Sequence, residues 1–216
     1  MKKNFDSLRA PVYRIIDPTI TWMVRHRIHP NFLTTMGFVT VVAAGYLYHL
    51  DHVRWAGFFV LLGGTWDIFD GQVARVGGTA SKFGAFYDST LDRISEIVVF
   101  LGLLSLYNSY AREWADVWMV YVIFVAMGGS IMVSYTRARA EGLGLDCKVG
   151  VMPRPERVVL LGLGSLAFGL MWNGLVLRGV IIILAASAAV TTIQRIVWVY
   201  QHAKDIPIED PALPGQ

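Results

Sequence analysis

The stretch DIFDGQVARVGGTASKFGAFYDSTLD, residues 67–92, places four carboxylates in an otherwise apolar part of the chain. Asp67 and Asp70 stand three residues apart, and Asp88 and Asp92 stand four apart. Residues at these spacings share one face of an α-helix. Glycine residues between the two pairs break the helical pattern. The stretch therefore predicts two antiparallel helices joined by a short turn, with the two carboxylate pairs facing each other.

The four carboxylates also predict a metal site. Ionised carboxylates repel one another and are costly to bury, so a cation is needed to hold them together. Hard oxygen ligands select Mg²⁺, Mn²⁺ or Ca²⁺ over softer metals. Salt bridges to Arg75, Lys82 and Arg93 are the alternative, but an ionisable residue within a membrane segment is by default functional. We therefore expect two Mg²⁺ ions, replaceable by Mn²⁺, on the four Asp side chains.

The composition indicates an all-α integral membrane protein. Of the 216 residues, 55% are hydrophobic, and the mean hydropathy is +0.49. A bilayer-spanning helix needs about 20 mostly apolar residues. Six segments of the chain meet this length, and we expect each of them to span the membrane: about 32–50, 53–76, 82–107, 113–142, 154–172 and 174–202.

The two ends of the chain differ from the spans. Residues 1–30 mix arginines with apolar side chains, which predicts an amphipathic helix lying at the membrane interface. Residues 204–216 are rich in proline and are expected to be disordered. The six spans between them, 31–203, form one predicted domain. The single Cys147 excludes an intramolecular disulfide, and no cleavable signal segment is evident.

The basic residues predict the orientation. Six spans place both termini on one side of the membrane, and all but three of the 19 Lys and Arg residues fall on that side; the exceptions are Arg54, Arg112 and Arg178. By the positive-inside rule, that side is cytoplasmic. We therefore expect a multi-pass protein of the cell membrane, with both termini and the carboxylates at its cytoplasmic face.

Paired carboxylates at a membrane surface suit two-metal phosphoryl transfer, and Arg75, eight residues after Asp67, could add a guanidinium to the same phosphates. At eight fixed positions the chain resembles the CDP-alcohol phosphotransferase (CDP-alcohol phosphatidyltransferase) family, in the pattern Asp67-x2-Asp70-Gly71-x2-Ala74-Arg75-x8-Gly84-x3-Asp88-x3-Asp92. The resemblance implies six transmembrane helices, an N-terminal interfacial helix and a homodimer. It also implies that a second alcohol displaces CMP from a CDP-linked lipid.

The resemblance further implies roles for individual residues. Asp92 would be both a metal ligand and the general base toward the acceptor hydroxyl, a role that suits a carboxylate ionised at neutral pH. The CDP-linked lipid would be bound by residues before the first span and around the first carboxylate pair: Asn31, Phe32, Leu33, Thr34, Asp67, Gly71, Ala74, Arg75 and Ser81.

Polar residues at the cytoplasmic ends of the later spans predict an acceptor that carries a phosphate, since guanidinium groups bind phosphate well. They are Ser134, Arg137, Arg154, Arg157 and Arg195. The run DSTLDRISE, residues 88–96, is most similar to phosphatidylinositol-phosphate synthases, although Arg137 and Glu96 stand where Lys and Asp are more usual. We expect CDP-diacylglycerol and inositol phosphate as substrates, with glycerol phosphate or another alcohol as the alternative acceptor.

Two other classes of protein use acidic clusters in membranes. Intramembrane prenyltransferases bind a metal-bridged diphosphate, but they need more than six spans and have a different pattern. A cation transporter would hold its acidic cluster near the bilayer midplane and would not need Arg75. No nucleic-acid partner is expected. Release of CMP by the purified protein separates these alternatives from the predicted transferase.

Overall fold

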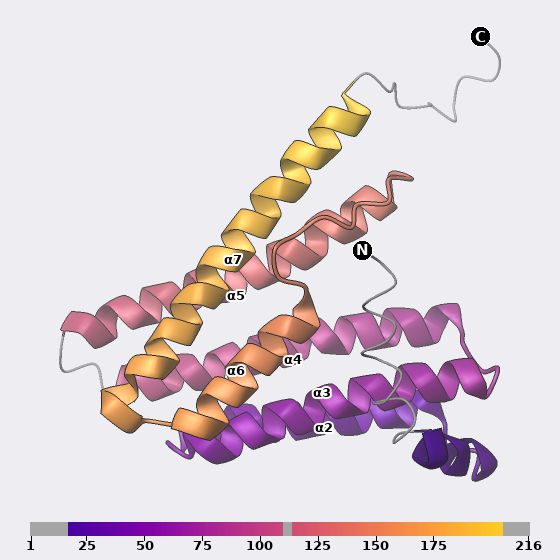
Figure 1. The fold of residues 1–216 in the computed structure, drawn as a ribbon, viewed down its shortest axis with the longest axis horizontal. Coiled ribbons are helices and arrows are strands. Elements are labelled where there is room, and N and C mark those ends of the chain that lie inside the picture. Colours follow the sequence, from indigo (N-terminus) through magenta and orange to yellow (C-terminus); the bar gives the residue numbers. More distant parts are fainter. Residues whose placement is uncertain (1–16, 110–113, 205–216) are drawn as a thin grey trace.

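The computed structural model describes residues 17–109 and 114–204, and all regular secondary structure within these ranges is helical (Figure 1). This confirms the predicted all-α fold. Residues 17–25 are helical, while the rest of the predicted N-terminal amphipathic segment up to residue 16 and the predicted tail from residue 205 lie outside the described residues. The helices that follow are α2 (Pro30–His49), α3 (Val53–Val76), α4 (Lys82–Ser109), α5 (Trp114–Glu141), α6 (Arg154–Phe168) and α7 (Met171–Ala203).

Local sequence explains where α2 and α6 begin and end. Pro30 is the first residue of α2, a position where the missing backbone N–H costs no hydrogen bond. Helix α6 is shorter than the predicted span because Gly169 has a φ of 53° and ends it in the left-handed conformation. The chain then turns through positive φ angles at residues 172–174 before it continues as α7.

The helices carrying the carboxylates are held apart by packing. Helix α2 packs against both α3 and α4, α6 packs against α3, and α7 packs against α5 and α6. Helices α3 and α4 run antiparallel (Figure 1) but do not pack on each other in the described residues. The sequence predicted antiparallel helices whose carboxylate pairs face each other; α2 packs against both helices, and Asp67 and Asp92 face each other across the guanidinium of Arg154 from α6.

Glycines bring α2 and α4 into close contact. A Cβ atom added to Gly102 on α4 would overlap the carbonyl oxygen of Gly45 on α2, and one added to Gly45 would lie 2.7 Å from the carbonyl oxygen of Val98. Backbones approach this closely in membrane proteins only where side chains are small. The crossing therefore fixes the distance between α2 and the helix that carries Asp88 and Asp92.

We expect Gly102→Ala to destabilise the protein by about 1–3 kcal/mol, because the new methyl group has only backbone atoms to displace. Gly128→Ala is the matched control: Gly128 also lies within a helix, α5, but no neighbouring atom lies within 4 Å of the added Cβ. That change should leave stability unchanged or raise it slightly, since Ala favours helices over Gly. Thermal unfolding in detergent measures both; equal melting temperatures for the two variants would contradict the close crossing.

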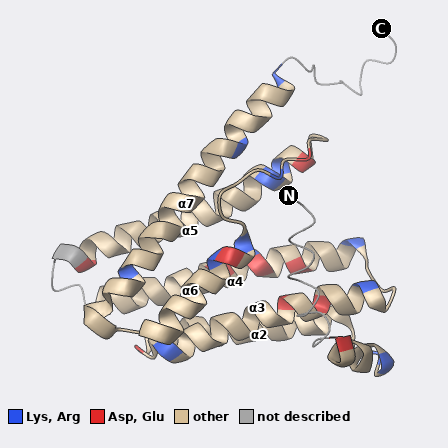
Figure 2. Ribbon diagram, viewed as in Figure 1, with Lys and Arg blue, Asp and Glu red and all other residues tan. Residues whose placement is uncertain are grey.

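Three helical segments of the described chain are long and apolar enough to cross a membrane: Pro30–His49, Asp116–Glu141 and Met171–Ala203. Helices α3 and α4 are longer than a bilayer requires but carry the Asp pairs, and α6 has only 15 residues. The chain is therefore a membrane protein. Figure 2 shows its charged residues concentrated where α3 and α5 end and where α4 and α6 begin.

A small apolar cluster joins the N-terminal helical residues to the rest of the fold. Ile20 and Met23 are buried against Leu33 of α2 and Val73 of α3. Burying apolar side chains of this size is worth about 1.5–3 kcal/mol each. The segment before α2 is thereby held beside the end of α3, close to the first carboxylate pair.

Candidate active site

A cavity of about 210 Å³ lies between the start of α2, the end of α3 and the start of α4. It contains most of the residues predicted to bind the CDP-linked lipid, together with one carboxylate from each pair. The lining residues are Pro30, Asn31, Thr34, Asp70, Gly71, Ala74, Arg75, Thr79, Ala80, Ser81, Gly84, Ala85 and Asp88. We call this the first cavity.

Three residues predicted to bind the CDP-linked lipid, Phe32, Leu33 and Asp67, do not line the first cavity; Asp67 lines a second cavity described below. Leu33 is buried in the apolar cluster with Met23 and Val73, and Phe32 is 55% exposed. The physical reason is helical geometry: Asn31 and Thr34 are three residues apart and share a face of α2, whereas the two residues between them point elsewhere. Only the Asn31 and Thr34 side of this segment faces the cavity.

Glycines keep the first cavity open. A Cβ atom on Gly71 would lie 3.3 Å from a terminal nitrogen of Arg75, and one on Gly84 would lie 3.4 Å from Asn31 Oδ1 and 3.2 Å from Ser81 Oγ. The Ser81 hydroxyl also accepts a hydrogen bond from the Gly84 N–H at 3.0 Å. The missing side chains therefore let polar groups lie against the backbone, which leaves room for a ligand.

Asp70 lies at the inner wall of the first cavity. It is 6% exposed, and the Thr34 hydroxyl donates a hydrogen bond of 2.6 Å to its Oδ2 atom. A hydrogen bond to an ionised carboxylate is stronger than one between neutral groups. Thr34 also borders a second cavity, so this bond marks the boundary between the two.

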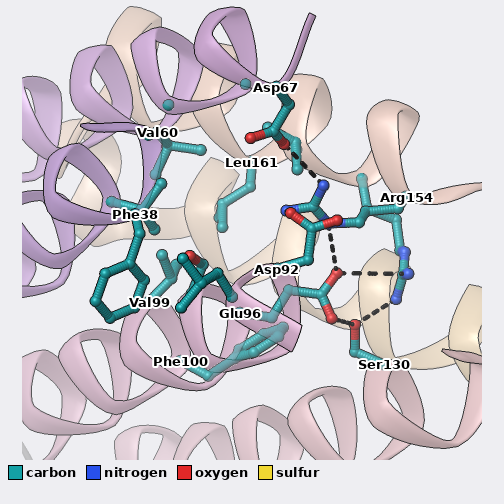
Figure 3. Close-up of a pocket in the computed structure, with 18 of the residues that line it drawn as sticks. Phe38, Val60, Asp67, Asp92, Glu96, Val99, Phe100, Ser130, Arg154 and Leu161 are labelled. Carbon is teal, nitrogen blue, oxygen red and sulfur yellow. Dashed lines mark hydrogen bonds and ion pairs between the residues drawn. The ribbon is translucent and has the colours of Figure 1, made fainter. Parts of the chain in front are cut away.

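The second cavity, of about 60 Å³, contains Asp67 and Asp92, the other member of each carboxylate pair. Arg154 from α6 joins them: its Nη1 lies 2.8 Å from Asp67 Oδ2 and its Nη2 lies 2.7 Å from Asp92 Oδ1 (Figure 3). The cavity is apolar farther in, where Phe38, Val60, Val99, Phe100 and Leu161 line it. The three helices α3, α4 and α6 thus meet at one ionic contact.

A buried polar network extends this contact. Arg157 is 7% exposed and donates a hydrogen bond to the Ser130 hydroxyl, which donates to Glu96 Oε2 at 2.8 Å. Glu96 Oε1 lies 3.6 Å from Arg157 Nη2 and 3.4 Å from Arg154 Nε (Figure 3). Glu96 and Ser130 were not among the predicted site residues. The spacing of Glu96, four residues after Asp92 on the same helix, could have identified it as a site residue. No sequence pattern identifies Ser130 on α5.

The other residues predicted to bind the acceptor lie outside both cavities. Arg195 is buried, and its guanidinium donates to the backbone carbonyl oxygens of Val149, at 3.0 Å, and Val133. Arg137 is exposed and pairs with Glu141 at 2.8 Å. Ser134 is half-buried and lines neither cavity. Of the five predicted acceptor residues, the structure therefore brings Arg154 and Arg157 to the carboxylates.

The carboxylates fit a hard divalent cation by their chemistry. In the described part of the chain, neither Asp70 nor Asp88 forms an ion pair, and the buried Asp70 is contacted by the Thr34 hydroxyl and the Gly71 backbone. An ionised buried carboxylate needs a cation. No three acidic, His or Cys side chains among the described residues converge on one metal position. At Asp67 and Asp92, the guanidinium of Arg154 provides the positive charge instead.

The sequence matches the family profile of CDP-alcohol phosphatidyltransferases over residues 27–193, a range that includes both cavities. It is 33% identical over 199 residues to archaetidylinositol phosphate synthase of Methanothermobacter thermautotrophicus, covering 92% of this chain and 95% of that protein. It is also 33% identical over 191 residues to phosphatidylinositol phosphate synthase of Mycobacteroides abscessus, covering 87% and 84%. The chain belongs to the CDP-alcohol phosphatidyltransferase family.

Solved structures share the fold. Phosphatidylinositol phosphate synthase of Mycobacterium tuberculosis with CDP-DAG bound matches with a TM-score of 0.76 and 30% identity, covering 87% of this chain and 94% of that chain. The same enzyme in complex with manganese and citrate matches with a TM-score of 0.76 and 28% identity, covering 85% and 88%. These matches confirm the predicted family and identify the protein as a phospholipid-synthesising transferase of the membrane.

Proposed function

We propose that this protein transfers the phosphatidyl group of CDP-diacylglycerol to inositol phosphate and releases CMP. The observation that carries the proposal is that the four carboxylates lie where two cavities meet, with Arg75 in the first cavity and Arg154 and Arg157 in the second. Relatives named for inositol-phosphate lipid synthesis support the choice of acceptor. Phosphatidylglycerophosphate synthesis is the alternative within the family.

The first cavity is suited to the CDP part of the lipid substrate. The Arg75 guanidinium lies beside Gly71 and can bind a diphosphate, and Asn31 and Ser81 offer polar atoms beside Gly84 in the same cavity. Asp67, Asp70, Asp88 and Asp92 would hold two divalent ions, Mg²⁺ or Mn²⁺; the related Mycobacterium tuberculosis enzyme has been solved in complex with manganese. Such ions neutralise the diphosphate and the leaving CMP.

The second cavity is suited to the acceptor. Arg154 and Arg157 are held close to Asp92 by Glu96 and can bind a phosphate monoester. Asp92 would accept the proton of the attacking hydroxyl as the new P–O bond forms to the lipid phosphate. The bond between that phosphate and CMP breaks, so CMP leaves and the phosphatidyl group remains on the acceptor.

The membrane arrangement is part of the same proposal. Helices α2 to α7 form six spans, with both termini and both cavities on the cytoplasmic side and residues 1–30 along the interface. Charges grouped at one end of α3, α4, α5 and α6 support this orientation (Figure 2). A domain covering 31–203 and a homodimer remain predictions from the sequence and the family resemblance.

We expect Arg75→Gln to raise the KM for CDP-diacylglycerol by about one to two decades, the cost of one charged hydrogen bond of about 1.5–3 kcal/mol. The KM for inositol phosphate should stay nearly unchanged, since Arg75 lines only the first cavity. Steady-state kinetics with each substrate varied in turn measures the effect. Arg139→Gln, an exposed arginine on α5 outside both cavities, is the control. Equal increases in both KM values would contradict separate subsites.

The proposal is tested by CMP release from purified protein in detergent. Release should require CDP-diacylglycerol and inositol phosphate together, because the lipid phosphate is attacked by the acceptor hydroxyl. Neither a prenyltransferase nor a cation transporter would release CMP. Release at the full rate without any acceptor would indicate hydrolysis and would contradict the proposed transfer.

A further inference from the structure

The guanidinium of Arg154 occupies an unusual position for an acceptor-binding group. Its three nitrogen atoms each face a different carboxylate: Asp67 at 2.8 Å, Asp92 at 2.7 Å and Glu96 at 3.4 Å (Figure 3). Two of these acids belong to the predicted metal-binding set. The Arg154 side chain is 22% exposed, and that of Asp92 is 13% exposed. The contact is therefore a partly buried cluster of charges.

Charge decides whether this arrangement can persist when metal binds. A divalent cation bound to Asp67 and Asp92 would lie close to the guanidinium that contacts both carboxylates, and the two positive groups would repel each other. Arg154 and a metal ion therefore compete for the same two carboxylates. In the structure described, Arg154 is the partner.

Glu96 differs from the other two acids. It contacts Arg154 Nε at a longer distance and is tied to α5 and α6 by Ser130 and Arg157. If the Arg154 guanidinium is released from Asp67 and Asp92, it can remain in contact with the carboxylate of Glu96. Arg154 is also the first residue of α6, so its side chain projects from a helix terminus next to the loop that precedes it.

We propose that Arg154 is an internal counter-ion of Asp67 and Asp92 that the divalent metal displaces, and that Glu96 is the positioning residue that retains the displaced guanidinium beside the site. This inference rests on the proposed function in one respect, the divalent metal at the four carboxylates. Its consequence is that Arg154 opposes metal binding in the absence of substrates and becomes available to the acceptor phosphate when metal is bound.

Mn²⁺ binding to the purified, nucleotide-free protein tests the proposal, with free Mn²⁺ measured by electron paramagnetic resonance. Arg154→Gln should tighten Mn²⁺ binding by about tenfold or more, since it removes a charged competitor worth at least one charged hydrogen bond. Arg93→Gln is the matched control: Arg93 lies 3.6 Å from Asp92 and carries the same charge, but it contacts only that one carboxylate. Its effect should be far smaller. Unchanged or weaker Mn²⁺ binding in Arg154→Gln would overturn the proposal.

Glu96 is tested in two backgrounds. Glu96→Gln should weaken Mn²⁺ binding more in the wild-type protein than in Arg154→Gln, because only the wild type has a guanidinium to be retained. Glu96→Asp, which keeps the charge, should keep most of the Mn²⁺ affinity that Glu96→Gln loses in the wild-type background. Equal effects in both backgrounds would overturn the positioning role. A melting temperature recorded for each variant verifies folding, and Arg154→Lys, which keeps one charge but loses the fork, should bind Mn²⁺ with intermediate affinity.

The proposed function fails by a different result. If Mn²⁺ binding survives the combined change Asp67→Asn and Asp88→Asn, the carboxylates do not hold the metal, and both the metal-dependent function and this inference are overturned. If binding is lost there but is unchanged in Arg154→Gln, only the counter-ion role is overturned.

Discussion

Replacing Asp92 with Asn is expected to lower the rate of CMP release by about 10²- to 10⁴-fold, the usual cost of losing a general base. Asp92 on α4 has its Oδ1 2.7 Å from Arg154 Nη2 of α6, and its side chain is only 13% exposed. An amide of the same shape keeps the packing but cannot accept a proton. The measurement is single-turnover CMP release, which separates the chemical step from product release.

Binding and folding controls define what this loss means. Binding of CDP-diacylglycerol and the melting temperature should be nearly unchanged in Asp92→Asn, because Asp92 lines the second cavity and not the first. Asp88→Asn, in the first cavity, is the matched change and should weaken lipid binding as well. If Asp92→Asn loses lipid binding as severely as turnover, the main role of Asp92 is to hold metal or structure, and the assignment as general base is contradicted.

Removal of divalent metal is expected to abolish activity. The diphosphate of the lipid substrate must bind close to the four carboxylates, and like charges repel. A divalent cation bound between them makes this binding favourable. Treatment with EDTA should stop CMP release, and Mg²⁺ or Mn²⁺ should restore it after the chelator is removed. The control is CDP-diacylglycerol incubated with metal alone, which should release no CMP. Full activity in the presence of chelator would contradict metal-dependent transfer.

Much of the architecture could be predicted from the sequence because its signals are local. The pattern between Asp67 and Asp92 predicted the two carboxylate-bearing helices and the turn between them. The predicted span 53–76 coincides with α3. Gly169 was not recognised as a helix end, so the fifth span was predicted too long. A glycine's φ depends on the packing around it and cannot be deduced from the residue type alone.

The contacts between distant helices could not be predicted. Spacing along α3 and α4 placed each Asp pair on one face, but the packing of both helices against α2 depends on tertiary contacts such as that at Gly45 and Gly102. The same holds for the arginines of the later helices. Arg154 and Arg195 were predicted to act together, whereas Arg154 contacts the carboxylates and Arg195 contacts backbone carbonyl groups. Both are arginines near a helix end, and the sequence does not distinguish them.

The identity of the acceptor is decided by the lipid product that the purified protein makes. CDP-diacylglycerol is supplied with equal concentrations of inositol phosphate, glycerol phosphate, inositol and serine, and the products are identified by mass spectrometry. Because the guanidiniums of Arg154 and Arg157 line the same cavity as Asp92, the predicted product is phosphatidylinositol phosphate, with the acceptor's phosphate retained. A product made mainly from glycerol phosphate, or from unphosphorylated inositol, would contradict the proposed inositol phosphate acceptor.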